Sequence, residues 1–372
     1  MDIVLSHTTA LEAYRAGIRT TCDARAALPS RAPTPTDVRS WIAAFPFGHE
    51  LPQPFDLLVS ETTSSSRRAD ARALASSAAL PTGAIRKIDE TAGIVSPELM
   101  LLQMARTATF LELVLLVCEF CGLYSIYTDS PTGMLQRETP LTSKIAVLRF
   151  LEQARGYRGA AILRKACRLA FDASGSPMES KLAIRVSWPR RLGGYALPVE
   201  SLNEELATSL SEKRIRKPDL LLRRPEDSTM GICVDYHGGV HEGPEHHRID
   251  DERANELLAL GVRPYVLWRQ QYQSMRYMDE LFDKQIRADL GLCPPHPSRD
   301  RAALELARRR ALLAELNAID GTRWGASRKG RTVQAALDEA VRAARELKKG
   351  GCRWAGKPTL RLKAIAHDTK NL

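Results

Sequence analysis

The stretch that decides the fold is Lys-Pro-Asp-Leu-Leu-Leu at 217–222, followed after a short polar break by Ile-Cys-Val-Asp-Tyr-His at 232–237. Each contains an apolar run of strand length, which predicts two neighbouring strands joined by a turn. Asp219 precedes the first run, and Asp235 closes the second. In an antiparallel pair, residues at these two places meet at one end of the sheet. The pattern therefore predicts two carboxylates that face each other.

Two carboxylates held close together predict a site for a divalent cation. Like charges repel and raise one pKa unless a cation neutralises them. Carboxylate oxygens suit Mg²⁺ or Mn²⁺, and such an ion activates water and neutralises charge on a phosphate. A carboxylate against an apolar run is also costly without a partner. This favours a site role for Asp219 and Asp235.

Four histidines follow the second run of this stretch. His237 and His241 lie nearest to Asp235. A histidine near neutral pH serves as a proton acceptor or as a metal ligand, so these two are candidate site residues. We expect His246 and His247 to be loop residues.

A third carboxylate precedes the stretch. Glu179 ends the phrase Ser-Pro-Met-Glu at 176–179, a pattern that begins a helix. Its carboxylate either satisfies a backbone amide as part of a capping box or joins Asp219 and Asp235 at the site. The sequence leaves both alternatives open.

After the histidines, residues 250–261 predict a helix and residues 264–268 a strand. Arg253 lies on this helix. Its guanidinium either contacts a phosphate or pairs with Asp250 or Glu256 on the same helix.

These phrases resemble the PD-(D/E)XK nuclease superfamily. Pro218-Asp219 fits its first element, 235–237 stands in the place of its D/E-X-K, and Glu179 fits the acidic residue on the preceding helix. The closer resemblance is to the branch similar to very-short-patch-repair (Vsr) endonucleases. That branch shows E-x-D-G-x-x-H and then D-x-x-R-x-x-x-L-x-x-x-G. The matching residues are Asp235, His237, Gly238 and His241, then Asp250, Arg253, Leu257 and Gly261.

The resemblance implies an α/β fold with a restriction-endonuclease-like mixed sheet flanked by helices. It implies metal-dependent phosphodiester hydrolysis of DNA, with Glu179, Asp219 and Asp235 holding Mg²⁺ or Mn²⁺ and with His237 or His241 helping to activate water. The sequence departs from the pattern in two ways. His237 stands where the superfamily has lysine, and Asp235 and His237 replace the branch's Glu and Asp. The alternative is therefore a catalytically degenerate nuclease fold that acts as a DNA-binding, antitoxin-like transcription regulator.

Length and composition predict a reduced, cytoplasmic protein of two or three domains. The chain has 372 residues and 7 dispersed cysteines. It has no signal-peptide pattern at its start. The most apolar stretch, 107–123, is too short and too charged to span a membrane, so we expect a buried helix there. Cys118 and Cys121 lie in it as C-x-x-C without a second ligand pair, which favours packed free thiols over zinc or redox chemistry.

We expect three regions along the chain. Residues 1–155 are expected to form a mainly helical module, which includes a small-residue helix at 69–79. Its order of elements is similar to antitoxin-like regulators of abortive-infection systems, in which such a module accompanies a Vsr-like domain. Residues 156–293 are expected to form the nuclease-like domain, and residues 294–372 a proline-rich linker and a basic helical tail.

The net charge of +10 is concentrated in the tail. Residues 299–372, from Arg299 to Leu372, hold 18 Lys and Arg and 8 Asp and Glu. A basic segment of this kind predicts a polyanion partner, with DNA the first candidate, whereas a solvated tail is the plain alternative. Trp324 and Trp354, each after an arginine, either stack on bases or anchor a loop. A protein-interaction module is a third class of function, and the sequence leaves homo-oligomerisation open.

Overall fold

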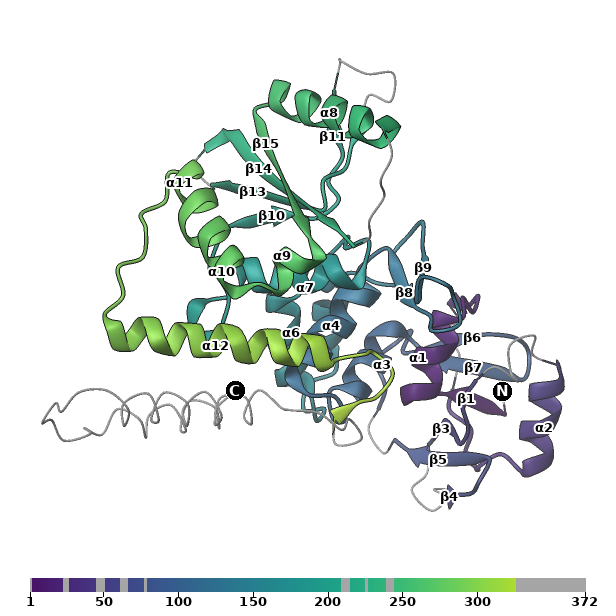
Figure 1. Ribbon diagram of the computed structural model, residues 1–372. Helices are drawn as coiled ribbons and strands as arrows, with labels where there is room; N and C mark the ends of the chain where they lie inside the picture. The colour runs from purple at the N-terminus through teal and green to yellow at the C-terminus, as the bar shows by residue number, and fades with distance from the viewer. Residues whose placement is uncertain are drawn as a thin grey trace, which may run out of the picture.

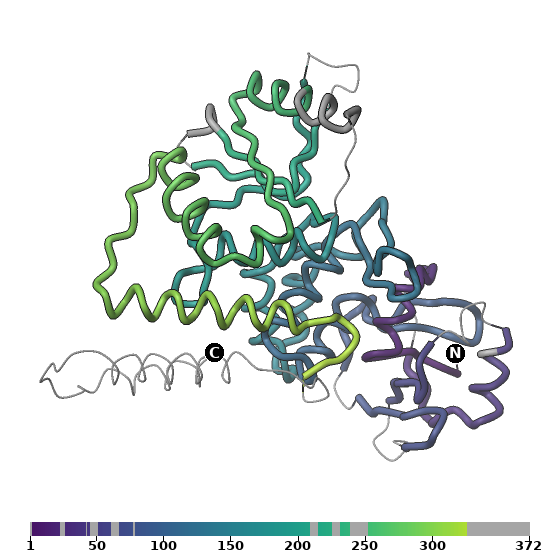
Figure 2. Tube along the Cα trace, viewed as in Figure 1, coloured from purple at the N-terminus to yellow at the C-terminus, as the bar shows by residue number. Residues whose placement is uncertain are grey.

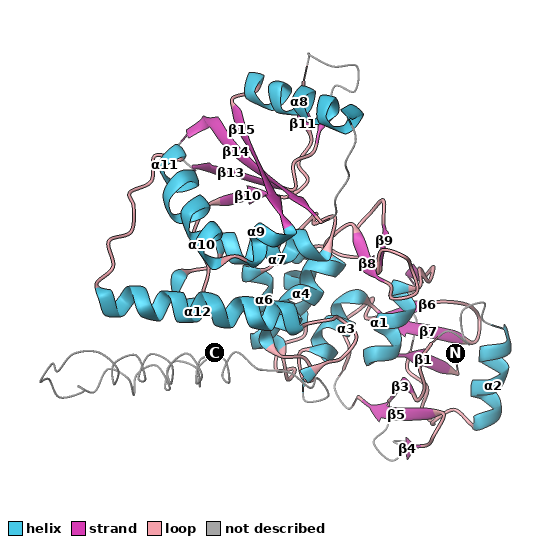
Figure 3. Ribbon diagram, viewed as in Figure 1, coloured by secondary structure: helices cyan, strands magenta, loops and turns pink. Residues whose placement is uncertain are grey.

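The computed structural model describes residues 2–22, 27–44, 51–60, 66–76, 79–208, 215–224, 227–238 and 244–325. Figure 1 shows two sheets, one in the N-terminal part and one in the C-terminal part, with a layer of helices between them. Figure 3 shows that helices cover the C-terminal sheet on both faces. In the described part of the chain, no helix is long and apolar enough to cross a membrane.

Among the described residues, the N-terminal sheet has seven strands in the order β2-β6-β7-β1-β3-β5-β4. They are β1 (Ile3–Leu5), β2 (Thr21–Cys22), β3 (Phe55–Val59), β4 (Ser66–Arg67), β5 (Ala71–Ala75), β6 (Ile85–Lys87) and β7 (Ala92–Val95). The pairs β1–β7 and β3–β5 are parallel, and the other pairs are antiparallel.

Six helices and a small hairpin accompany this sheet among the described residues. They are α1 (His7–Arg15), α2 (Pro35–Ala44), α3 (Pro97–Met104), α4 (Phe110–Phe120), α5 (Lys144–Gln153), α6 (Ala160–Leu169), β8 (Tyr124–Ile126) and β9 (Met134–Gln136). The start of α4 is fixed by a capping box between Thr109 and Glu112. The helix is buried, as its apolar sequence predicts, and Cys118 and Cys121 are buried free thiols. Both of these predictions are confirmed.

The expectation of a mainly helical N-terminal module is wrong. The sheet is hard to predict from the sequence because its strands have only two to five residues, too few to show a clear alternation. The predicted helix at 69–79 is instead β5. Its alanines favour a helix by intrinsic propensity, but five residues of parallel pairing with β3 bury Ala71 and Ala73. Tertiary pairing overrides propensity here.

In the part of the chain that the structure describes, the C-terminal sheet has four strands in the order β10-β13-β14-β15. They are β10 (Val199–Ser201), β13 (Leu220–Arg224), β14 (Asp227–His237) and β15 (Val262–Trp268), and a separate pair is formed by β11 (Leu206–Ala207) and β12 (Ile215–Arg216). The first three strands pair antiparallel, and β14 pairs with β15 in parallel. The predicted neighbouring strands and the predicted strand at 264–268 are therefore confirmed.

Helices flank both faces of this mixed sheet, as expected. On one face α8 (Pro244–Ala259) packs Leu257 against Leu221 and Cys233. The other face packs against α7 and the helices that follow β15. These are α7 (Pro177–Ser187), η2 (Arg190–Leu192), α9 (Arg269–Gln273), α10 (Met275–Met278), the π-helix η3 (Asp279–Ile286) and α11 (Arg287–Asp289).

The boundary between the two parts lies later than residue 155. The helix α6 packs Leu163 and Cys167 into the N-terminal core. The next helix, α7, belongs to both parts, since it gives Ile184 to the N-terminal core and Leu182 and Val186 to the C-terminal one. The spacing of apolar residues predicts these helices but does not show which of the two cores each helix packs into.

The first basic helix of the expected tail is docked on the body. It is α12 (Arg299–Ala318), whose Leu312 and Leu316 enter the N-terminal core. Figure 2 shows α12 running beneath the helices that join the two parts. Arg309 on it pairs with Asp279 at 2.8 Å and with Asp283 at 2.6 Å in the C-terminal part. This helix therefore fastens the two parts to each other.

Trp324, after α12, is buried in the N-terminal core, with the Arg15 guanidinium 5.7 Å from the centre of its ring. Of the two alternatives for this ring, anchoring is the one observed. Residues 326–372, which include Trp354, lie outside the described part. They hold 12 Lys and Arg and 4 Asp and Glu, and so most of the excess positive charge.

Candidate functional site

Asp219 and Asp235 meet at one end of the C-terminal sheet. Leu220 of β13 pairs with Val234 of β14, so the residue before Leu220 and the residue after Val234 come together. The backbone N–H of Asp219 donates to Oδ1 of Asp235 at 3.0 Å. In return, the N–H of Tyr236 donates to Oδ2 of Asp219 at 2.6 Å. Each carboxylate is thus bound to the backbone of the other strand.

Glu179 lies in the first turn of α7 and is 8% exposed. Its N–H donates to Oγ of Ser176 at 3.1 Å, so the predicted cap is present. Its carboxylate does not complete the box on Ser176. Oε2 instead accepts the N–H of Gly175 and the side-chain amide of Asn203, both at 2.6 Å. The capping alternative is therefore correct in part, and Asn203 holds the carboxylate in place.

Asn203 links the helix to the sheet. Its side chain donates to Glu179, and its backbone N–H donates to the carbonyl of Pro218 at 3.0 Å. Its φ of +51° lies in the left-handed region, which asparagine tolerates better than most residues. Sequence reasoning missed this residue because an asparagine in a loop is common. The only sequence feature that could have indicated Asn203 is its position, after β10 and before Pro218-Asp219.

The three carboxylates influence one another electrostatically. Burial raises the pKa of Asp219 to about 7, with further increases from the charges of Glu179 and Asp235. The hydrogen bond from Tyr236 and the charge of Arg253 act in the opposite direction. Burial also raises the pKa of Glu179, against the hydrogen bonds from Asn203 and Gly175. The sheet end is therefore an acidic cluster of Glu179, Asp219 and Asp235 with more negative charge than its surroundings neutralise.

Arg253 supplies the positive charge at this end. Its Nη2 lies 3.0 Å from Oδ2 of Asp235 and donates to the carbonyl of Lys217 at 3.1 Å. Of the alternatives left open for Arg253, a pair with Glu256 is not observed, since Glu256 pairs with Arg216, and the side chain of Asp250 lies outside the described residues. The partner of Arg253 lies on the sheet, which helical spacing cannot reveal.

The histidines are less closely placed. His237 lies two residues after Asp235 and so on the same face of β14. Its ring contacts that of Trp268 edge to face, with centroids 4.9 Å apart. His241 lies outside the described residues. His246 and His247 are not loop residues as expected, because they lie in α8, and their side chains are outside the described part. The structure thus brings Glu179, Asp219 and Asp235 together, and His237 lies on the same face of β14 as Asp235 with its ring against Trp268.

The oxygen donors of the acidic cluster suit a hard divalent cation in chemical type. One of them, Oδ1 of Asp219, accepts no hydrogen bond from any described residue, whereas the Glu179 carboxylate is hydrogen-bonded to Asn203, Gly175 and Ser176. However, within the part of the chain that the structure describes, no three His, Cys, Asp or Glu side chains are grouped to hold one metal ion. As they stand, the carboxylates are bound to amides and to Arg253.

Comparison with known proteins found no relative. No protein-family model, no curated protein and no solved structure matches the chain. The geometry of the acidic cluster and the motifs that form it are therefore the basis for a functional conclusion.

Proposed function

We propose that the acidic cluster hydrolyses phosphodiester bonds of DNA with Mg²⁺ or Mn²⁺. The observation that carries the proposal is the gathering of Glu179, Asp219 and Asp235 at one sheet end, where burial and mutual repulsion raise the pKa of Asp219 to about 7. Packing alone gains nothing from such repulsion. A divalent cation would remove it, and carboxylate oxygens are the ligands that such ions prefer.

The positions of the motif residues support the resemblance to the PD-(D/E)XK superfamily. Asp219 lies directly before β13, and Asp235 and His237 end the adjacent strand β14. Glu179 lies on the helix that precedes the sheet, and a parallel strand follows α8. Three short phrases that are far apart in the sequence thus meet at one place, and a shared site explains their order and spacing.

Each residue has a role in this proposal. Glu179, Asp219 and Asp235 would hold the ion, using Oδ1 of Asp219 first because this oxygen accepts no hydrogen bond from a described residue. When bound, such an ion activates water and neutralises charge on the phosphate. His237, on the same face, accepts a proton in the position that the superfamily gives to lysine. Arg253 would remain paired with Asp235 when the ion is bound.

Cleavage of a supercoiled plasmid with Mg²⁺ or Mn²⁺ tests this function. The variant Asp219→Asn keeps the shape of the side chain and an oxygen for the Tyr236 N–H but removes the charge, so cleavage should be lost. Glu200→Gln is a matched control on β10 of the same sheet, where Glu200 makes an exposed ion pair with Arg223. Cleavage by wild type and control but not by Asp219→Asn is the expected result. Cleavage that persists in Asp219→Asn would place the activity elsewhere or in a contaminant.

A second function, DNA binding without cleavage, is favoured by one observation. The Nη2 of Arg253 already lies 3.0 Å from Asp235, so a cation of the protein itself occupies part of the place that a metal would take. In this case the fold is a degenerate nuclease that works as an antitoxin-like regulator. Wild-type protein that binds DNA but leaves it intact under all metal conditions would establish this function. If the protein neither binds nor cleaves DNA, a protein-interaction module is the function class that remains.

A further inference from the structure

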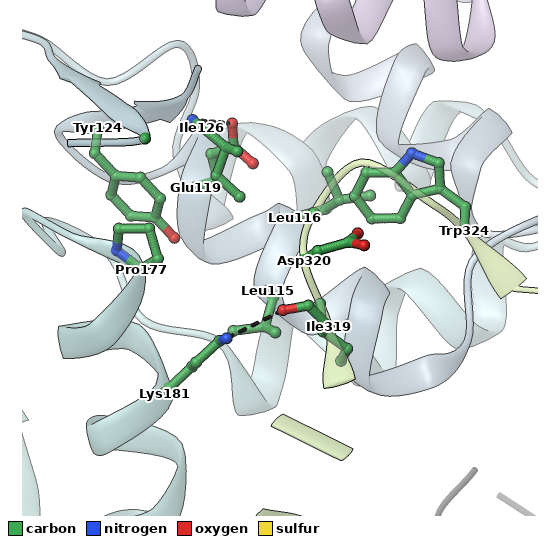
Figure 4. A pocket seen from close by; sticks show the side chains of 12 residues that line it. Leu115, Leu116, Glu119, Tyr124, Ile126, Pro177, Lys181, Ile319, Asp320 and Trp324 are labelled. Atoms are coloured by element: carbon green, nitrogen blue, oxygen red, sulfur yellow. Dashed lines mark hydrogen bonds between the residues drawn. The ribbon is translucent and has the colours of Figure 1, made fainter. Parts of the chain in front are cut away.

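A cavity of about 130 Å³ lies where the N-terminal part, α7 and the segment after α12 meet. Figure 4 shows its walls. Most of the lining is apolar and comes from α4, β8, α7 and the chain after α12. The apolar lining residues are Leu115, Leu116, Ile126, Pro177, Ile319 and Trp324. The cavity is close in size to the roughly 150 Å³ that accepts benzene in an engineered apolar cavity.

The cavity is separated from the acidic cluster by the first turn of α7. Pro177 and Lys181 line it, and because they are four residues apart they share one face of the helix. Glu179, between them, points to the other side, where its carboxylate meets Asn203. One turn of α7 thus presents the acidic cluster on one side and the cavity on the other.

Lys181 brings a positive charge into this apolar cavity. Its Nζ donates to the carbonyl of Ile319 at 3.1 Å (Figure 4). An ammonium group has three donors, and no described carboxylate forms an ion pair with this one. Two of its N–H groups therefore remain for a ligand.

The two carboxylates beside the cavity are satisfied elsewhere. Glu119 accepts two hydrogen bonds from the guanidinium of Arg15, at 2.8 and 2.7 Å, and one from the N–H of Ile126 at 3.0 Å. Asp320 accepts from the N–H of Thr322 at 2.9 Å and from the Arg323 side chain at 2.8 Å. Arg15 is shared between Glu119 and Glu12. Burial lowers the pKa of Lys181, and the charge of Asp320 raises it, although the two side chains form no ion pair. The Lys181 ammonium therefore keeps two N–H groups that no described acceptor takes, and these are what a ligand would meet.

We propose that this cavity binds a small monocarboxylate whose apolar body fills the space and whose carboxylate accepts hydrogen bonds from Lys181. The size excludes a nucleotide, because sites for drug-sized ligands have roughly 300–1,000 Å³. The apolar walls disfavour an inorganic anion, which would bury its charge without partners on most sides. The proposal is independent of the nuclease function, since it requires neither DNA nor a metal.

The test uses full-length protein labelled with ¹⁵N at tryptophan, titrated with benzoate and with the neutral benzamide. Trp324 lines the cavity, and its indole resonance is assigned with Trp324→Phe. Benzoate should shift this resonance at millimolar concentrations, and the indole signal of Trp41, which lies in the N-terminal core against Phe55, should not move. Benzamide should bind about tenfold or more weakly, because it lacks the charge-assisted hydrogen bonds. Inorganic phosphate should not bind.

Variants assign the effect to Lys181. Lys181→Met should weaken benzoate about tenfold or more and leave benzamide unchanged. Lys284→Met is a matched control, since that lysine makes an exposed pair with Glu280 on another helix. Equal binding of the two probes, unchanged benzoate affinity in Lys181→Met, or no shift at Trp324 would each overturn the proposal. If Lys181→Met does not fold, the comparison of the two probes on wild-type protein still decides.

Discussion

The backbone N–H of Asp219 donates to the carboxylate of Asp235 at 3.0 Å, and the N–H of Tyr236, next to Asp235, donates to the carboxylate of Asp219 at 2.6 Å. The two strands thus hold two like charges face to face. The hydrogen bonds offset part of the repulsion but not all of it, since the pKa of Asp219 is raised to about 7. The repulsion between carboxylates that remains makes the sheet end a candidate site, and it has measurable consequences.

The raised pKa of Asp219 predicts how stability depends on pH. The unfolded chain releases this proton near the ordinary pKa of 3.8 and the folded chain near 7. Between these values the folded state holds the extra proton, so the contribution to stability is complete below pH 3.8 and is lost as pH rises through 7. The slope is at most about 1.4 kcal/mol per pH unit.

Urea denaturation of wild type and Asp219→Asn from about pH 4 to about pH 8 checks this. The variant lacks the titrating group, so the difference between the two curves isolates Asp219 from other groups. The wild type should lose stability relative to the variant as pH rises. A difference that stays flat over this range would mean that Asp219 titrates at its ordinary pKa.

Removing Arg253 should destabilise the site. Arg253→Gln leaves Oδ2 of the buried Asp235 without its cation, which should lower the free energy of unfolding by about 1–3 kcal/mol, since the arginine is one-third exposed. Arg263→Gln is the control, because Arg263 is 52% exposed in its pair with Asp289 and should contribute less than about 1 kcal/mol. Equal, small effects of the two substitutions in urea denaturation would show that the Arg253 pair is only a surface contact.

Asn203 is predicted to contribute through both its amide and its backbone. Asn203→Gly removes the hydrogen bond to Glu179 but tolerates a φ of +51°, and should cost about 1–3 kcal/mol. Asn203→Ala should cost about 1 kcal/mol more, because alanine is strained at that φ. In both variants the pKa of Glu179 should rise, since the Asn203 hydrogen bond lowers it. Carboxyl ¹³C shifts measure the pKa. An unchanged pKa of Glu179 would show that the Asn203 amide does not act on this carboxylate.

The central strands and the meeting of Asp219 with Asp235 were predictable from the sequence. A carboxylate at the border of an apolar run is a local pattern, and antiparallel pairing converts it into a contact. The cap at Ser176 was predictable for the same reason. The partners of Glu179 and Arg253 were not, because Asn203 and Asp235 reach them from other elements. Such contacts depend on how a helix is set against a sheet, which no local pattern records.

The N-terminal sheet, by contrast, was hard to predict from local sequence patterns. Strands such as β2 and β4 have two residues each and exist only because neighbours pair with them. The docking of α12 was hidden for a different reason. Its sequence is rich in arginine, which is typical of a solvated helix. However, Arg309 forms ion pairs with two aspartates of η3, Asp279 and Asp283. Composition gives the charge of a helix and not the surface that it meets.

Gly325 is predicted to be required for the segment after α12. Its φ is +55°, and a Cβ there would lie 1.9 Å from the backbone oxygen of Thr107. Gly133→Ala provides the control, since Gly133 also has a positive φ, of +72°, but has nothing within 4 Å of such a Cβ. Both substitutions should show the strain of alanine at positive φ, about 1 kcal/mol. Gly325→Ala should cost at least about 1 kcal/mol more, because the backbone at Thr107 would have to move. Equal thermal stability of the two variants would contradict the close packing of this segment on the residues before α4.

The docked helix changes where the basic tail can be removed. A chain ending at residue 298 lacks Leu312 and Leu316 in the core and the ion pairs of Arg309, so it should unfold at lower urea than the full chain. A chain ending at residue 325 keeps these interactions and should match the full chain in stability. Urea denaturation distinguishes the two. Equal stability of the two truncated chains would show that α12 does not hold the parts together.

The same two chains locate the surface that binds DNA. Residues 326–372 carry 12 Lys and Arg and 4 Asp and Glu, so ending the chain at 325 should weaken binding to duplex DNA at low salt. It should also flatten the dependence of affinity on salt, by about 0.9 in log K against log salt for each phosphate that the shortened chain no longer neutralises. Fluorescence anisotropy at several salt concentrations measures both. An unchanged slope in the chain ending at 325 would place the phosphate-binding residues on the folded body, where the arginines of α12 and β15 would be the next residues to replace.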